Sequence, residues 1–167
     1  AHENMLRGII PPLCGDFDNA WKHSNGAWIR SEIWACLAPG FPQIAMKYAY
    51  MDACVDHGGG EGTYAELFTA TMESLAFFET DIAEIIQKSL QNIPKASRLY
   101  QCIQMVVEGH KKGEAWKTIR NQLVDFCSDI GWFQAPANVA FVILGLLYGE
   151  GDFKQSMIYA VNCGDDT

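Results

Sequence analysis

The sequence lacks any cluster of basic residues. Its densest positive stretch is the pair Lys111-Lys112, and the formal net charge of the 167 residues is −8. Proteins that bind duplex nucleic acid group their positive charge to contact the phosphates, so we expect no nucleic-acid partner. A small anionic ligand is compatible with this charge, because helix N-termini and backbone N–H groups bind phosphate without lysine or arginine.

Long apolar runs and alternating patterns are also missing. No stretch reaches the roughly 18 apolar residues of a membrane-spanning helix, and the apolar segment 137–148 is too short. No segment alternates apolar and polar residues in the way that is typical of a half-buried strand. The N-terminus carries no signal-peptide pattern. We therefore expect an all-α fold, no membrane partner and a cytoplasmic location.

The six cysteines include no Cys-x-x-Cys pair. Three of them, Cys54, Cys102 and Cys127, fall inside helical patterns. The simplest interpretation is a set of buried, reduced thiols in a reducing compartment. Zinc binding and disulfide bonds are the alternatives.

Apolar residues recur at helical spacing from residue 43 onward. In the segment 63–79, for example, Tyr64, Phe68, Met72 and Phe78 form a stripe that predicts core packing. The patterns predict about seven helices packed orthogonally, because no strict heptad of a coiled coil is present. The predicted helices are 43–56, 63–79, 81–90 with Asp81 as N-cap, 97–110, 114–126, 136–147, and 153–161 with Asp152 as N-cap.

The first 41 residues differ from the rest of the chain. Proline and glycine punctuate them, at Pro11-Pro12, Gly15 and Asn25-Gly26, which predicts a largely irregular stretch. Hydrophobic residues make up 49% of the sequence and charged residues 19%, an ordinary globular composition. We therefore expect residues 1–167 to form a single helical domain or a fragment of one, irregular over 1–41 and helical over 42–167.

The sequence ends on hard oxygen donors. Asp165, Asp166 and Thr167 follow the apolar helical run 153–161. Carboxylates and hydroxyls suit Mg²⁺, Mn²⁺ or Ca²⁺ rather than zinc. Carboxylates at a helix C-terminus oppose the helix dipole unless a cation or a surface turn compensates. We expect a metal site here, with a charged surface turn as the alternative, and we expect these residues to belong to a longer chain.

Several motifs, in their order along the chain, resemble those of the ADP-ribosylglycohydrolase family. The segment Ser24-Asn25-Gly26-Ala27-Trp28-Ile29-Arg30 is similar to a Gly-Asn-Gly-Ala-x-Met-Arg substrate loop, and Asn162-Cys163-Gly164-Asp165-Asp166-Thr167 resembles an Asn-x-Gly-Gly-Asp-x-Asp-Thr metal motif. Between these two motifs lie Pro39-Gly40-Phe41-Pro42, Asp52-Ala53, Asp56-His57, Gly60-Glu61-Gly62-Thr63-Tyr64 and Ile93-Pro94. The similarity covers roughly residues 24–167.

The resemblance implies an orthogonal multi-helix bundle and Mg²⁺-dependent hydrolysis of ADP-ribosyl glycosidic bonds. The substrate would be an ADP-ribosylated molecule or a small ADP-ribosyl compound, bound by Asn25, Gly26, Ala27, Arg30 and His57. The complete protein would bind two Mg²⁺ ions, with Asp166, Asp165 and Thr167 among the ligands. The family's Thr/Ser-Asp-Asp ligands have no counterpart here. We therefore expect these 167 residues alone to be inactive, and their sequence identifies no catalytic base.

The chemistry of the candidate residues leaves alternatives. Asn25-Gly26 permits positive φ, which would turn backbone N–H groups toward an anion, and Arg30 could pair with a phosphate. A simple turn with a surface arginine is the competing interpretation. His57 is either a ligand contact or a residue that compensates a helix dipole. The glycine-rich segment 58–62 matches no nucleotide loop and predicts a tight turn between helices. Trp21, Trp28 and Trp34 are core residues or adenine-stacking residues.

Departures from the family's usual residues keep other functions open. Ser24, Trp28, Ile29, Ala65 and Asp165 are not the commonest residues at their positions. One alternative is a non-catalytic family member that binds ADP-ribose or a related nucleotide, or that is structural. A helical protein-interaction module without a ligand is the other.

Overall fold

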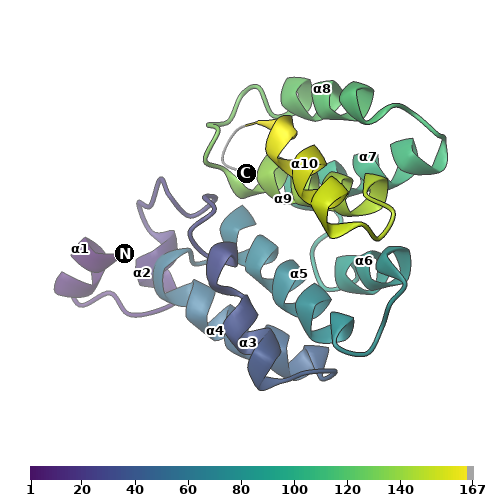
Figure 1. Cartoon of the computed structure of the whole chain (residues 1–167). Coiled ribbons are helices and arrows are strands. Elements are labelled where there is room, and N and C mark those ends of the chain that lie inside the picture. Colours follow the sequence, from purple (N-terminus) through teal and green to yellow (C-terminus); the bar gives the residue numbers. More distant parts are fainter. Residues whose placement is uncertain (165–167) are drawn as a thin grey trace. The chain divides into compact units, whose positions relative to one another are not determined.

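A computed structural model describes residues 1–164 of the chain (Figure 1). This part contains helices and no strand, which confirms the all-α prediction. The short N-terminal helices are α1 (His2–Leu6), α2 (Leu13–Asp16), the 3-10 helix η1 (Trp28–Arg30) and α3 (Glu32–Leu37). The longer ones are α4 (Pro42–Asp56), α5 (Glu61–Ala76), α6 (Ile82–Leu90), α7 (Arg98–Lys111), α8 (Trp116–Phe126), α9 (Ala135–Tyr148) and α10 (Phe153–Cys163).

The seven predicted helices after residue 42 are all present, and side-chain caps define three of their starts. Asp81 accepts a hydrogen bond from the Glu84 N–H at 3.1 Å, and Asp152 accepts one from the Gln155 N–H at 2.8 Å. Ser97 accepts one from the N–H of Tyr100 at 3.1 Å. Each cap satisfies a backbone donor that has no partner within its helix.

The N-terminal stretch is more helical than the sequence predicted. Three short α-helices and η1 lie within residues 1–41, and none is longer than six residues. Such short segments show no sustained periodicity, so the sequence pattern could not reveal them. The chain also divides into two compact units, Ala1–Pro94 and Lys95–Thr167.

The first unit is built on the close packing of α4 against α5. Ala45, Ala49 and Ala53 recur every four residues on α4 and are fully buried. Residues four apart lie on one helix face, and their small side chains let the two helix backbones approach closely. Ala70 of α5 belongs to the same core cluster. The helix pair thereby fixes the position of the α4 C-terminus relative to the first turns of α5.

The core of α4 consists of small side chains, and one detail of the predicted core is wrong. The large apolar residues of α4 point outward: Tyr48 and Met51 are exposed, and the alanine stripe is buried instead. Phe78, predicted to continue the core stripe of Tyr64, Phe68 and Met72, is 78% exposed because α5 ends at Ala76. Phe68 is fully buried, as predicted.

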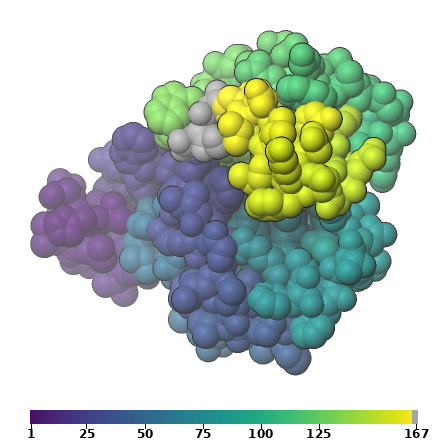
Figure 2. Space-filling view, viewed as in Figure 1, coloured from purple at the N-terminus to yellow at the C-terminus, as the bar shows by residue number. Residues whose placement is uncertain are grey.

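The second unit is organised around α9, which packs against α7, α8 and α10 (Figure 1). Val139, Phe141 and Leu144 are buried on α9, together with Ile103 of α7 and Leu123 of α8. Helix α10 can approach α9 closely because α9 carries a glycine at position 145. A Cβ there would lie 2.6 Å from the carbonyl oxygen of Ser156 in α10. The outer side of α10 lies at the surface (yellow in Figure 2).

No helix in the described part of the chain has the length and apolar character needed to cross a lipid bilayer.

Candidate functional site

The five residues predicted to bind substrate lie together in the first unit. Asn25, Gly26 and Ala27 form the turn that leads into η1, which ends at Arg30, and His57 follows the last residue of α4. The turn and the helix end are in direct contact, because Arg30 donates to Asp56, the neighbour of His57. Residues more than twenty positions apart in sequence therefore form one site.

Arg30 joins the turn to two carboxylates of α4. Its Nε donates to Asp52 at 2.5 Å, and its Nη2 and Nη1 donate to the two oxygens of Asp56 at 2.8 and 3.1 Å. The Nη1 also donates to the carbonyl oxygen of Gly26 at 2.9 Å. These four bonds use most of the five N–H donors of a guanidinium. The arginine holds the turn against α4, and a phosphate at Arg30 would compete with two carboxylates.

The same contacts set the ionisation of the Arg30–Asp56 pair. Partial burial disfavours both charges, but the hydrogen bonds to Asp56 and Asp52 outweigh it and raise the pKa of Arg30. Burial likewise raises the pKa of Asp56, and hydrogen bonds from His57 and Arg30 reverse the effect and lower it well below its usual range. Both groups are therefore charged at neutral pH.

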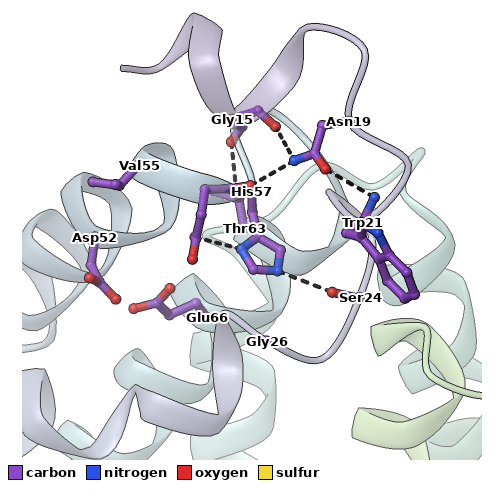
Figure 3. A network of polar contacts seen from close by, with 12 residues as sticks. Gly15, Asn19, Trp21, Ser24, Gly26, Asp52, Val55, His57, Thr63 and Glu66 are labelled. Carbon is purple, nitrogen blue, oxygen red and sulfur yellow. Dashed lines mark hydrogen bonds and ion pairs between the residues drawn. The ribbon is translucent and has the colours of Figure 1, made fainter. Parts of the chain in front are cut away.

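His57 is held between a carboxylate and a hydroxyl. Its Nδ1 lies 2.7 Å from Asp56 Oδ1, and its Nε2 lies 3.2 Å from Ser24 Oγ (Figure 3). Asp56 is ionised and can only accept, so Nδ1 carries a proton. In the neutral ring the Nε2 lone pair then accepts the Ser24 O–H. Only 5% of His57 is exposed, so both ring nitrogens are oriented within the protein.

Two glycines leave room for the His57 ring. A Cβ on Gly26 would lie 3.1 Å from His57 Cε1, and one on Gly62 would lie 2.6 Å from His57 Cδ2. Neither Asn25 nor Gly26 has the positive φ that this pair permits. Glycine is favoured at position 26 by the close approach of the imidazole, because the ring would have to move by a few tenths of an ångström to admit a Cβ.

The glycine-rich turn 58–62 also packs against the chain's own backbone. A Cβ on Gly60 would lie 2.6 Å from the carbonyl oxygen of Lys22, to which the Gly62 N–H donates at 3.2 Å. The Glu61 N–H donates to Nδ1 of His23 at 3.1 Å. The turn joins α4 to α5, as predicted, and the segment Lys22–Ser24 occupies the space that its glycines leave.

Helix α2 and the loop after it anchor the other side of the α4 end. The Asn19 side chain donates to the carbonyl oxygens of Gly15 and Asp56 at 2.6 and 2.7 Å (Figure 3). Gly58 has φ +59 and lies so close to Asp16 that a Cβ would be 2.5 Å from its backbone nitrogen. These contacts fix the backbone at Asp56, and therefore the carboxylate that orients His57.

Glu66 is a fully buried carboxyl group beside this network. The Trp34 indole N–H donates to Glu66 Oε1 at 3.1 Å, whereas Oε2 meets no N–H or O–H donor. The Glu66 carboxyl faces that of Asp52 (Figure 3), and two carboxyl groups can hydrogen bond only if one is protonated. Burial, reinforced by the charge of Asp52, raises the pKa of Glu66 to about 9. Glu66 is the group that holds the proton at neutral pH.

The described residues supply no metal centre. Residues 1–164 contain no cluster of three or more histidine, cysteine, aspartate or glutamate side chains arranged to hold a metal ion. Asp52 and Asp56 are both occupied by the Arg30 guanidinium. The predicted ligands Asp165, Asp166 and Thr167 lie outside the described residues. The carboxylate and hydroxyl oxygens of these three residues are donors that fit Mg²⁺.

Sequence reasoning missed four residues as members of the site: Ser24, Asp52, Asp56 and Glu66. A signal was available for the two aspartates, since a spacing of four places both on one face of α4. Glu66 interrupts the apolar pattern of α5, and a carboxylate among core positions is a sign of a buried polar network. Ser24 stood at the start of the substrate-loop motif, but nothing in the sequence indicated its contact with His57, which is 33 positions away.

Comparison with known proteins gave one result. No curated protein and no solved structure matched the chain. The sequence model of one family, described as ADP-ribosylglycohydrolase, matches residues 2–167, almost the whole sequence. It extends the similarity seen in the motifs to the N-terminal helices. This 167-residue chain belongs to the ADP-ribosylglycohydrolase family.

Proposed function

We propose that this chain acts in the Mg²⁺-dependent hydrolysis of ADP-ribosyl glycosidic bonds. Membership of the family implies glycohydrolase-type activity on ADP-ribosylated substrates. The observation that carries the proposal is that the turn Asn25–Arg30 and His57 lie together: Arg30 and His57 both bond to Asp56, and Gly26 lies against the His57 ring. The family resemblance assigned both segments to the substrate.

In this proposal the turn and His57 bind and orient the substrate. Ser24 is half-buried, and its hydroxyl donates to His57, so the lone pairs of Ser24 Oγ can accept a hydroxyl of a sugar. Arg30 is a positioning residue, because its bonds to Asp52, Asp56 and the Gly26 carbonyl hold the turn in one conformation. A preorganised turn binds a ligand without the entropic cost of ordering it.

The metal ligands proposed are Asp165, Asp166 and Thr167. Bound Mg²⁺ would supply Lewis-acid stabilisation of the charge that develops as the glycosidic bond breaks. Glycosidic bonds usually break through an oxocarbenium-like transition state beside carboxylates. None of the described residues is assigned as the general base.

The test combines binding and turnover. ADP-ribose is titrated calorimetrically into the full-length protein with and without Mg²⁺, and hydrolysis is followed on ADP-ribosylated arginine, ADP-ribosylated serine and small ADP-ribosyl compounds. We expect binding that weakens at least tenfold in His57→Ala, and release of ADP-ribose from at least one substrate class. Binding without turnover would favour the non-catalytic alternative. The absence of both would refute the proposal.

A further inference from the structure

Two cysteines of the second unit face each other across a helix pair. Cys102 lies in the second turn of α7, and Cys127 follows the last residue of α8. Their sulfur atoms are 3.5 Å apart, and no disulfide joins them. A disulfide needs the sulfurs at about 2.0 Å, about 1.5 Å closer than they are here. The two thiols are near enough to react with each other once one of them is oxidised.

The two thiols differ in their access to solvent. Cys102 is fully buried, whereas Cys127 is 6% exposed. Cys127 also lines a cavity of about 160 Å³ formed by residues 124–137, with Ser128, Gly131 and Trp132 among its walls. A single water occupies about 30 Å³ in the liquid, so hydrogen peroxide, which is only slightly larger, fits. A small oxidant can reach Cys127 before it reaches Cys102.

A positive charge lies beside the pair. The Arg98 guanidinium forms an ion pair with Asp129 and stacks over the Phe126 ring at 5.3 Å, immediately before Cys127 in sequence. The hydrogen bond to Asp129 raises the pKa of Arg98, and the negative charges of Cys127 and Cys102 thiolates would raise it further. Because such interactions are reciprocal, the charge of Arg98 acts toward the reactive thiolate form and against the desolvation that burial imposes on both thiols.

We propose that Cys102 and Cys127 form a peroxide-sensitive dithiol, in which Cys127 is oxidised first and Cys102 then closes a disulfide. The Cys127 thiolate attacks one oxygen of hydrogen peroxide, the O–O bond breaks, and the products are a sulfenic acid and hydroxide. The Cys102 sulfur attacks Cys127 Sγ, the S–O bond breaks, and a second hydroxide leaves. The two thiol protons convert both hydroxides to water, so two thiols lose two electrons to one peroxide.

Tryptic peptides make the product easy to identify. Cleavage after Arg98, Lys111, Arg120 and Lys154 places Cys102 alone in peptide 99–111 and Cys127 alone in peptide 121–154. Reduced, desalted full-chain protein is treated with equimolar hydrogen peroxide, and the remaining thiols are blocked with N-ethylmaleimide. We expect two fewer maleimide adducts, a mass loss of about 2 Da from the two hydrogens removed, and one cross-linked peptide. Dithiothreitol should restore the separate peptides.

Variants test the order of the two steps. In Cys102→Ser the cross-link should be absent, and dimedone, which traps sulfenic acids, should label Cys127. Cys36→Ser is the matched control, because Cys36 is exposed on α3, and it should leave the cross-link unchanged. Peptides 99–111 and 121–154 that stay separate in the wild-type chain while Cys36 is oxidised would overturn the proposal. A dimedone adduct on Cys102 in Cys127→Ser with none on Cys127 in Cys102→Ser would overturn the proposed order.

Discussion

Replacing Glu66 with glutamine should stabilise the protein above pH 5, by an amount that grows with pH. The folded-state pKa of Glu66 is about 9, whereas its ordinary value is 4.5. The contribution of the protonated Glu66 carboxyl to the free energy of unfolding is therefore fully present below pH 4.5, declines as the pH rises, and is lost by about pH 9. Glutamine cannot ionise, so Glu66→Gln removes this decline. Its amide oxygen can still accept from Trp34, and its amide N–H₂ can donate to Asp52.

The structure gives the size of the effect. Each pH unit between the two pKa values costs about 1.36 kcal/mol, so the interval from 4.5 to 7 corresponds to about 3 kcal/mol. In a protein of this size each kcal/mol shifts Tm by about 2–4 °C, which predicts a Tm about 6–12 °C higher for Glu66→Gln at pH 7. The charges that face Glu66 are those of Asp52 and Arg30. The wild type and Glu66→Gln both retain them.

Urea unfolding of the wild type and Glu66→Gln at several pH values between 5 and 9 measures the difference directly. Burial also raises the pKa of Glu73, to about 7, but this group is present in both proteins and cancels in the difference. Glu108→Gln on the exposed surface of α7 is the control and should change stability by less than about 0.5 kcal/mol at every pH. A difference for Glu66→Gln that does not vary between pH 5 and 9 would refute the assignment of a buried, protonated carboxyl.

Three further predictions concern the site. Gly62→Ala should destabilise the fold by about 1–3 kcal/mol and weaken ADP-ribose binding, because the new Cβ would lie 2.6 Å from His57 Cδ2. Gly59→Ala is the control, since a Cβ there would meet nothing within 4 Å. Calorimetry that finds the same change in stability and binding for both variants would contradict the argument. Asp56→Asn, measured by chemical unfolding, should cost about 1 kcal/mol after solvent screening, and no change would mean that the Arg30 bond is not formed in solution. Asp166→Ala should abolish any Mg²⁺-induced rise in Tm without unfolding the protein, because a ligand of the folded state stabilises it by mass action; a retained rise would exclude Asp166 as a ligand.

The helices could be predicted because their signals are local. Asp81 and Asp152 mark helix starts by their own side chains, and an apolar stripe such as that of α7 is repeated often enough to be recognised. The burial of α4 could not be predicted in the same way. Its apolar residues surround the helix, and only the partner α5 determines that the small alanine face is the one buried.

The sequence grouped part of the candidate site, but it could not give the contacts among its residues. The family resemblance identified Asn25, Gly26, Ala27, Arg30 and His57 as neighbours of a substrate, and the structure brings all five to one place. The resemblance could not show that Arg30 bonds to Asp52 and Asp56. These partners are 22 and 26 positions from Arg30, and pairing over such separations leaves no periodic pattern in the sequence. The same holds for the proton on Glu66, which depends on burial.

The arrangement around Arg30 determines what kind of ligand site this is. The one guanidinium faces two carboxylates, so the network carries no excess positive charge with which to attract a diphosphate. In the proposed function, affinity for an ADP-ribosyl group comes instead from hydrogen bonds of fixed geometry and from a bound cation. This proposal agrees with the net charge of −8 and with the hard oxygen donors at Asp165, Asp166 and Thr167. A site of this kind depends on the precise placement of its turn. That dependence accounts for the several bonds of Arg30 and for the two glycines that flank the ring of His57.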